Sequence, residues 1–251
     1  MLSPIELTAR QESSILGRTN PLVKLGIALG WLVGLGLIHD PLRPLALALA
    51  VVAAGLILGS IPPARLLQGL APLVAAAGSI ALANLVFAAA NTDPAARELI
   101  RVGSLRITAE AVVVASSIGA RVVAIVATGV VFAQTTDPTR LVDALVQQAR
   151  VPERFAYGAL AAYQAIPRLG QDLGTLRHAR RIRGLSGDWH PKLLIGLLVR
   201  AIRHADQLAL AMDARAFGTT PRTAFRPLMW RWTDLAVGAG GAVVIVLMLL
   251  A

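Results

Sequence analysis

The sequence predicts an all-α, polytopic membrane protein with about five transmembrane helices and a cytoplasmic domain of long amphipathic helices. Three observations predict this fold class. Hydrophobic residues make up 56% of the chain and charged residues only 15%, with a mean hydropathy of +0.66. Five long apolar runs are present, and a basic amphipathic segment separates the fourth run from the fifth. The bilayer, rather than a large soluble core, is therefore expected to surround most apolar side chains.

A helix needs roughly 20 residues to cross the hydrocarbon layer of a membrane, and five apolar runs are candidates for such helices. The runs are Leu22–Ile38, Leu45–Gly59, Leu70–Ala90, Ala111–Ala133 and Leu235–Ala251. The second is short and follows Pro41 and Pro44, so four spans plus a buried hairpin remains an alternative. Gly238-Ala239-Gly240-Gly241 lies inside the last run and indicates close helix packing. We expect a membrane region over 1–134, a cytoplasmic domain over 135–231 and a C-terminal transmembrane helix over 232–251.

Basic residues predict the orientation. Of the 24 Lys and Arg residues, 15 lie between Thr135 and Arg231, which places that segment on the cytoplasmic side by the positive-inside rule. The loop Asn91–Arg106 is then outside, although it carries three arginines. No apolar segment follows a basic N-terminal region, so no cleavable signal peptide is expected. The net charge of +10 would also suit nucleic acid, but aromatic residues do not interleave with the basic helices. The expected surroundings are therefore the lipid bilayer of the cell membrane, with no nucleic acid.

The basic segment contains three predicted helices. The first opens at Asp137 and Pro138 and is 10 to 12 residues long, the second covers about Phe155–Arg183, and the third about Pro191–Phe217. Apolar residues recur every three or four positions in both long helices, and these two stripes are expected to pack on each other. The stripes are Ile166, Leu169, Leu173, Leu176 and Ala179, and Leu198, Ala201, Ile202, Ala205, Leu208, Ala209 and Met212. Polar residues expected to lie off them include Arg168, Asp172, Arg200 and His204.

Catalytic and metal-binding patterns are missing from the sequence. The histidines, His39, His178, His190 and His204, lack metal-ligand spacing, and there is no aspartate-rich motif, P-loop or cysteine. We therefore expect a chain that is not an enzyme and binds no cofactor or metal itself. Arg121 lies inside the fourth apolar run, where a charge is costly and marks a possible intramembrane functional site. Snorkelling or a structural hydrogen bond is its ordinary explanation.

Two similar arginine motifs end the long helices. Ile182-Arg183-Gly184 ends the second helix, and Ala214-Arg215-Ala216 ends the third. Together with Arg18–Leu25 before the first span and Thr135–Leu145 at the start of the basic segment, this ordered pair resembles a known family. The chain is similar, over nearly its whole length, to the EcfT- and CbiQ-like T components of energy-coupling factor (ECF) transporters, a class of ABC importers.

The resemblance implies a mechanical coupler with Ile182, Arg183, Gly184, Ala214, Arg215 and Ala216 as its ATPase-coupling residues. Two separate ATPase subunits would bind ATP and Mg, and a small membrane S component would select a vitamin or transition-metal ion. The sequence departs from the family pattern twice. Ile182 stands where the family has a small residue, and Ala216 stands where it has a glycine, although alanine takes a positive φ less easily than glycine.

Two other functions are alternatives for a multi-pass membrane protein. The permease subunit of a conventional ABC importer would need a single Glu-Ala-Ala-type loop and its own translocation path, and a membrane-embedded transferase would need clustered aspartates. Neither pattern is evident in the sequence. The ECF resemblance therefore stands as the favoured hypothesis.

Overall fold

The computed structural model describes residues 9–38, 40–92, 96–102, 105–185, 189–219 and 224–250. Helices make up most of this described part, so the predicted all-α class is confirmed. The chain divides into two compact units. We call Leu7–Asp137 with Met229–Ala251 the membrane unit, and Pro138–Leu228 the basic unit. His39 lies outside the described residues.

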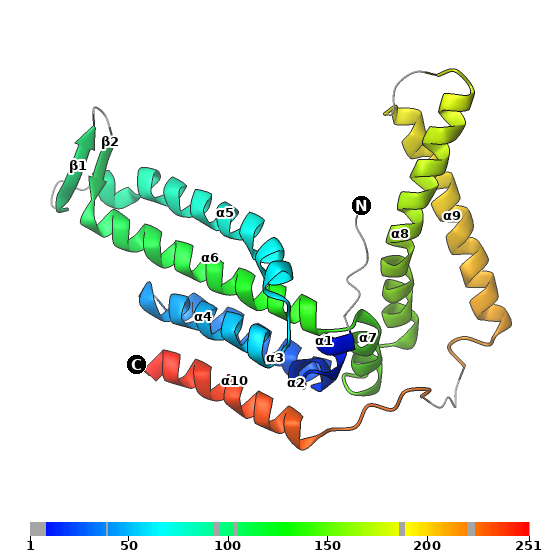
Figure 1. Cartoon of the computed structure of the whole chain (residues 1–251), viewed down its shortest axis with the longest axis horizontal. Coiled ribbons are helices and arrows are strands. Elements are labelled where there is room, and N and C mark those ends of the chain that lie inside the picture. Colours follow the sequence, from blue (N-terminus) through cyan, green and yellow to red (C-terminus); the bar gives the residue numbers. More distant parts are fainter. Residues whose placement is uncertain are drawn as a thin grey trace. The chain divides into compact units, whose positions relative to one another are not determined.

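Helices form at all five predicted apolar runs of the membrane unit (Figure 1). Three of them are long and apolar enough to cross a membrane, and the other two are shorter apolar helices. Prolines occupy the first turns of α3 and α5, where the missing N–H costs no helical hydrogen bond. The elements are α1 (Ala9–Ser13), α2 (Ile15–Arg18), α3 (Pro21–Leu37), α4 (Leu42–Ile57), α5 (Pro63–Phe87), the 3₁₀ turn η1 (Ala89–Thr92), α6 (Ala109–Thr135) and α10 (Trp232–Leu250).

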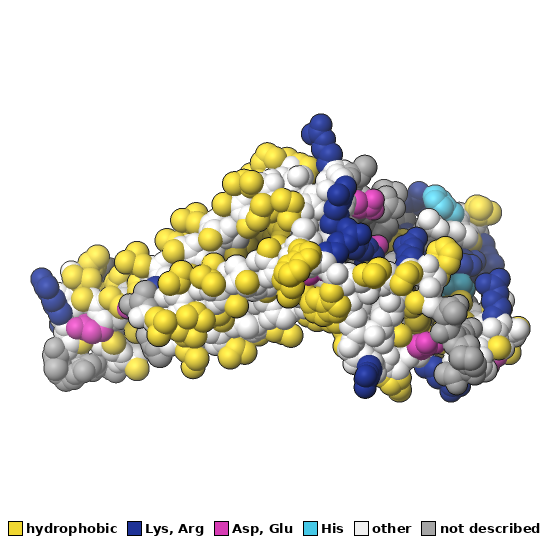
Figure 2. Space-filling view, turned by 90° about the horizontal axis from the view of Figure 1, so that it is seen from below, with side chains coloured by type: hydrophobic (Ala, Val, Ile, Leu, Met, Phe, Trp, Pro, Cys, Tyr) yellow, Lys and Arg dark blue, Asp and Glu magenta, His cyan; other side chains and the backbone are white. Residues whose placement is uncertain are grey.

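Helix α6 is the centre of the membrane unit. It packs against α5, α4 and α3, and α10 packs against α3. Leu47 and Val51 of α4 are buried with Ala124 and Ala127 of α6. Outward-facing side chains are largely hydrophobic, as the space-filling view shows along these helices (Figure 2). This arrangement suits lipid, because small residues let helices approach while large apolar side chains face the hydrocarbon.

Glycines in α10 allow close packing on α3, as predicted. A Cβ atom on Gly241 would lie 2.8 Å from side-chain atoms of Ile27, and one on Gly238 would lie 3.3 Å from Val23. The indole Nε1 of Trp31 also donates to the Gly241 carbonyl at 2.9 Å. The backbone of α10 at Gly241 therefore lies directly against side chains of α3, and a larger residue at 241 would prevent this close packing.

A buried lysine links three segments at one end of the membrane unit. The ammonium of Lys24 is 7% exposed, and its Nζ donates to the carbonyl oxygens of Leu16 at 2.9 Å and Thr135 at 2.7 Å. These carbonyls belong to α2 and to the last residue of α6. Because helix C-terminal carbonyls carry partial negative charge, they are favourable partners for an ammonium.

A buried carboxylate joins two helix N-termini at the same end. Asp234 is 1% exposed; its Oδ1 accepts from the N–H of Asn20 at 2.7 Å, and its Oδ2 from the N–H of Arg231 at 2.8 Å. The second bond is one half of a capping box at the start of α10. Asn20 in turn caps α3 by accepting from the N–H of Leu22 at 3.0 Å. One side chain therefore sets the starts of α3 and α10 side by side.

The predicted outer loop contains an element that the sequence analysis did not foresee. Strands β1 (Glu98–Val102) and β2 (Leu105–Thr108) form an antiparallel hairpin between α5 and α6. Arg106 pairs with Glu98 at 3.2 Å across the two strands. The apolar and charged residues here alternate over too few positions to give a clear strand signal.

The basic unit contains α7 (Pro138–Gln147), α8 (Glu153–Ile182) and α9 (Pro191–Ala214). The first helix has 10 residues, within the predicted length. Helix α8 begins two residues earlier than predicted, and α9 ends three residues before Phe217, whose backbone belongs to the turn that follows. Both long helices are therefore present, with boundaries moved by a few residues.

The predicted packing of the two stripes is partly wrong. Ile166 is 48% exposed and Leu198 is 60% exposed, so neither is covered by the facing helix. The space between α8 and α9 is instead a hollow of about 250 Å³, lined by Gly158, Ala161, Ala162, Ala165, Arg168, Leu169 and Asp172 of α8 and by Ala201, His204, Ala205, Leu208, Ala209 and Met212 of α9. Six residues of the predicted stripes face this space, whereas Ile166 and Leu198 are left uncovered. The six are Leu169, Ala201, Ala205, Leu208, Ala209 and Met212.

Polar residues predicted to lie off the stripes take part in this helix pairing. Arg168, Asp172 and His204 line the hollow between the helices. Asp172 also forms an ion pair with Arg200 at 2.7 Å, which joins α8 to α9. The two helices are therefore held by a charged contact as well as by small apolar residues.

Candidate functional site

The first arginine motif lies at a glycine-terminated helix end. Arg183 is the C-cap residue of α8, and Gly184 follows it with φ +71°. The N–H of Gly184 donates to the Arg181 carbonyl at 3.0 Å, and the N–H of Leu185 donates to the Arg180 carbonyl at 3.2 Å. This pair of bonds is the Schellman motif, which satisfies carbonyl groups that the helix leaves open.

The second arginine motif has the same geometry. Arg215 is the C-cap residue of α9, and Ala216 follows with φ +55°. The N–H of Ala216 donates to the Asp213 carbonyl at 2.9 Å, and the N–H of Phe217 donates to the Met212 carbonyl at 3.0 Å. The alanine therefore adopts the left-handed conformation that glycine adopts at the first site, at some cost in backbone strain.

Matched capping gives the two arginines the same position relative to their helices. Both side chains are exposed within this chain, and Ile182 is 87% exposed, so its bulk does not crowd the helix end. The structure brings the six predicted residues into two groups of three, but it keeps the groups apart. Arg183 begins the connection from α8 to α9, whereas Arg215 lies at the far end of α9, a helix about 36 Å long at 1.5 Å per residue.

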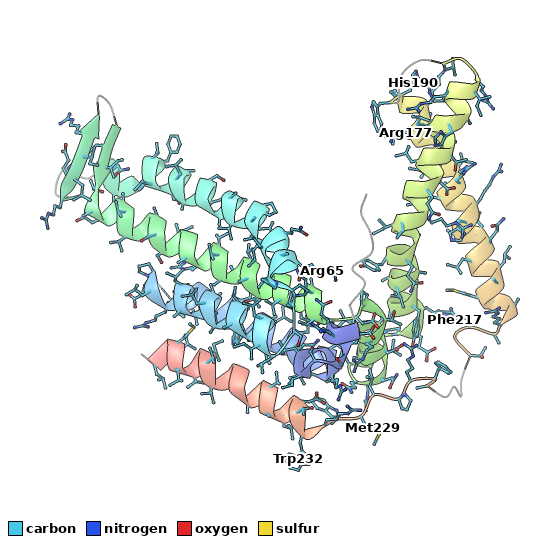
Figure 3. All side chains as sticks on the ribbon, in the orientation of Figure 1. Arg65, Arg177, His190, Phe217, Met229 and Trp232 are labelled. Carbon is cyan, nitrogen blue, oxygen red and sulfur yellow. The ribbon has the colours of Figure 1, made fainter. Side chains whose placement is uncertain are left out.

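Aromatic and polar contacts anchor the second helix end. Phe217 follows the end of α9 (Figure 3). Its ring packs edge-on against Tyr157 near the start of α8, with a centroid distance of 6.2 Å. The Tyr157 hydroxyl donates to Oδ1 of the buried Asp143 in α7 at 2.9 Å. No sequence pattern signals this contact, because Asp143 lies with Thr139 and Gln147 on the polar side of α7, where a solvent-exposed aspartate is expected.

A comparison with protein families matches the description "CbiQ: Cobalt transport protein" to residues 12–225, which include both arginine motifs. The chain belongs to the CbiQ family. The predicted family resemblance is confirmed, and with it the assignment as a multi-pass membrane protein of a transport family.

Curated relatives extend the match over most of the chain. The energy-coupling factor transporter transmembrane protein EcfT of Lactococcus lactis is 28% identical over 238 residues, which cover 88% of this chain and 87% of that protein. EcfT of Limosilactobacillus fermentum is 29% identical with the same coverage. A Bifidobacterium longum protein named as an ABC transporter ATP-binding protein is 26% identical over 248 residues, which cover 90% of this chain but 30% of that protein.

Metal ligands do not gather in the described part of this CbiQ-family chain. Among residues whose placement is described, no three His, Asp or Glu side chains are close enough to hold a metal ion together. The family description names cobalt transport, and within the described residues no group of this kind marks a place where such an ion would bind.

Arg121 lies near the middle of α6, a helix of 27 residues. It is half-buried, and its guanidinium donates to the Ser117 hydroxyl one turn earlier, at 3.3 Å. Its Nε atom is buried without a hydrogen-bond partner among the described residues. A cation so placed in a membrane-spanning helix is expected to face protein or trapped water rather than hydrocarbon.

We therefore expect Arg121→Leu to reduce assembly or transport more than Arg121→Lys does. Lysine keeps the charge and can reach Ser117, whereas leucine removes both the charge and the hydrogen bond to the Ser117 hydroxyl. The measurement is recovery of the chain with its partners and the uptake rate in cells. Equal behaviour of the parent and the leucine variant would show that this arginine is dispensable.

Ala216→Gly is expected to raise the free energy of unfolding by about 1 kcal/mol. The left-handed conformation costs a residue with a Cβ atom roughly 1–2 kcal/mol, and glycine avoids this cost but loses more backbone entropy on folding. Thermal unfolding in detergent would measure the change. The matched control is Ala214→Gly, at the last helical position, which should destabilise by about 0.5–1 kcal/mol. Two shifts of the same sign would contradict the strain at Ala216.

Proposed function

We propose that this chain is the transmembrane coupling (T) subunit of an ECF-type ABC importer. It transmits the ATP-driven motion of two ATPase subunits to a substrate-binding S component, for uptake of a vitamin or a transition-metal ion. Membership of the CbiQ family supports this proposal, as do relatives named as energy-coupling factor transporter transmembrane proteins. In this role the chain is non-catalytic, and ATP and magnesium are bound by the partner ATPases.

The observation that carries the proposal is the pair of matched helix ends. A guanidinium offers a planar fork of donors that can bind a carboxylate with two hydrogen bonds and stays charged at any physiological pH. Arg183 and Arg215 present this group from the same C-cap position, at two places separated by the length of α9. Two such sites suit two copies of similar partner surfaces better than one continuous interface.

A relative named as an ATP-binding protein supports the choice of partner. The Bifidobacterium longum protein carries a segment similar to 90% of this chain, and that segment makes up 30% of its length. A chain of this kind therefore occurs in one polypeptide with a larger ATP-binding protein. Because the two parts are covalently linked in that protein, we expect this chain to associate with a separate ATP-binding subunit.

Exposed apolar residues of α9 support a second, membrane-embedded partner. Five of them form one face of the helix and are 44–64% exposed: Leu194, Ile195, Leu198, Val199 and Ile202. A contiguous apolar patch of this kind marks an interaction site on a folded protein. The S component would cover it, and the Asp172–Arg200 pair would make α8 and α9 respond to the ATPases as one body.

Co-purification tests the proposal. A tagged copy of the chain, extracted from membranes in mild detergent, is expected to carry two ATPase subunits and one small hydrophobic protein, identified by mass spectrometry. Recovery of the chain without any ATPase would overturn the proposed role. Recovery with ATPases and a soluble binding protein would instead favour a conventional permease.

Topology gives a separate prediction, made easier by the absence of cysteine from the sequence. A cysteine at Ser186 would report on the basic segment, but Ser186 lies outside the described residues, so we choose the exposed Thr175 of α8 and Arg101 of β1. A cysteine at 101 should react with an impermeant maleimide on intact cells, and one at 175 only after permeabilisation. The reverse pattern would place the basic unit outside the cell.

A further inference from the structure

A cavity of about 470 Å³ lies inside the membrane unit, where α2, α3, α4, α6 and α10 face one another. Its wall is almost wholly apolar and includes Trp31, Val51, Val131 and Val244. Cavities of 300–1,000 Å³ with apolar walls and few polar groups are typical of ligand sites. A space so lined is poorly suited to ordered water, because water needs two or more polar partners.

Small residues account for the cavity. Helix α3 packs against α10 and α4 against α6, and the residues that these pairs turn toward the cavity include Ala28, Ala54 and Gly240. A Cβ atom on Gly240 would meet no atom within 4 Å. At the neighbouring Gly241, in contrast, a Cβ atom would lie 2.8 Å from side-chain atoms of Ile27. Gly240 therefore borders open space, into which a larger side chain would fit.

The cavity is polar at one end. Lys24 and Thr135 belong to its wall, and Lys24 is the only ionisable residue among the described residues that line it. Ile15 and Leu16 of α2 line the same cavity. Arg18 lies two residues after Leu16, at the end of α2. Lys24 and Arg18 outnumber the buried carboxylate of Asp234 at this end of the unit, so the Lys24 end is the electropositive end of this apolar space.

Side chains near this end have the character of a membrane–water interface. Met229 and Trp232, at the start of α10, are 78% and 87% exposed, and Trp230 between them is 60% exposed (Figure 3). The exposed Arg65 lies at the start of α5, where its carbonyl accepts from Gln134 beside Thr135. Tryptophan and basic residues gather where helices meet the lipid headgroups.

We propose that this cavity holds an acyl chain of an anionic membrane phospholipid, with the headgroup at the level of Lys24. The bilayer surrounds the membrane unit with hydrocarbon chains, and the apolar wall offers them a space of suitable volume. The basic residues at the Lys24 end match an anionic headgroup. This proposal concerns the membrane unit alone and does not depend on the coupling of ATPases.

Photolabelling of the full chain in nanodiscs tests the proposal. The nanodiscs contain phosphatidylcholine with a minor fraction of phosphatidylglycerol that carries a diazirine in its acyl chain, and labelled peptides are mapped by mass spectrometry. We expect label on the wall residues Ala28 and Ala54. Gly240→Leu should lower this labelling about tenfold, equivalent to about 1.4 kcal/mol of binding. Gly26→Leu is the matched control, because Gly26 is an exposed α3 glycine with open space around it and lies outside the cavity wall.

Each other outcome would overturn the proposal. Label confined to outward-facing residues, or unchanged in the Gly240→Leu variant, would show ordinary boundary lipid. Equal labelling by a diazirine phosphatidylcholine would remove the preference for an anionic headgroup, and labelling by a diazirine fatty acid alone would exclude a phospholipid. If Gly240→Leu is not recovered from membranes, Ala50→Leu, at another cavity residue, replaces it with the same expectation.

Discussion

Arg183→Ala and Arg215→Ala should each weaken binding of an ATPase subunit by about 2–5 kcal/mol, the cost of truncating a buried interfacial charge whose partner is left unpaired. The chain itself should remain folded and inserted, since both arginines are exposed within it and the Schellman bonds use only backbone groups. The measurements are the ATPase recovered with the tagged chain and the uptake per ATP hydrolysed. Each single variant should lose one of the two ATPase contacts, because the two arginines lie at separate places.

A smaller effect would support a simpler explanation. A cation near a helix C-terminus interacts favourably with the helix dipole, by about 0.3–1 kcal/mol, without any partner protein. The controls are Arg177→Ala on α8 and Arg203→Ala on α9, which remove an arginine from the same helices away from their ends and should change ATPase recovery little. If both end variants retain their ATPases and transport at the parental rate, Arg183 and Arg215 are only helix-end charges.

Asp234→Ala should destabilise the membrane unit strongly. The substitution removes the acceptor of the buried N–H of Asn20 and of the partly buried N–H of Arg231, and each unsatisfied buried donor costs about 1–3 kcal/mol. It also removes the side-chain hydrogen bond that joins the starts of α3 and α10. A fall in the midpoint of thermal unfolding in detergent would measure this loss.

Two comparisons make that result specific. Asp234→Asn retains one carbonyl oxygen as an acceptor and should fall between the parent and the alanine variant. Asp40→Ala removes an aspartate whose side chain is 60% exposed and whose partner Arg43 lies 3.1 Å away, and exposed ion pairs contribute about 0–1 kcal/mol. An Asp234→Ala protein that unfolds at the parental temperature would show that water or another group satisfies both donors.

We therefore expect partner binding and membrane assembly to depend on different residues. The arginine sites belong to the basic unit, and the Asp234 and Lys24 contacts belong to the membrane unit. Substitutions at the helix ends should affect coupling while the unfolding temperature stays unchanged. Substitutions in the buried polar contacts should lower that temperature first, and transport only as a consequence.

Local sequence was enough to predict the helices and the two candidate sites. A run of apolar residues forms a membrane helix whatever its neighbours are, because every backbone group must find its partner within the helix. Helix ends are equally local, since a Schellman motif is completed within six residues, and Arg183-Gly184 and Arg215-Ala216 could therefore be located at their caps from the sequence. The strain expected for alanine at a glycine position is present at Ala216.

Only the tertiary structure decided which distant residues meet. Asp234 binds a backbone group 214 positions away, and Lys24 one 111 positions away, and no short pattern encodes such contacts. The stripes of α8 and α9 were partly misjudged for a related reason. Periodicity shows which residues share a face, but the way in which the two helices cross decides how much of that face is covered, and Ile166 and Leu198 remain exposed. The cavity beside Gly240 likewise depends on how α2, α3, α4, α6 and α10 pack together, because contacts between distant residues, and not the order of residues along the chain, determine that packing.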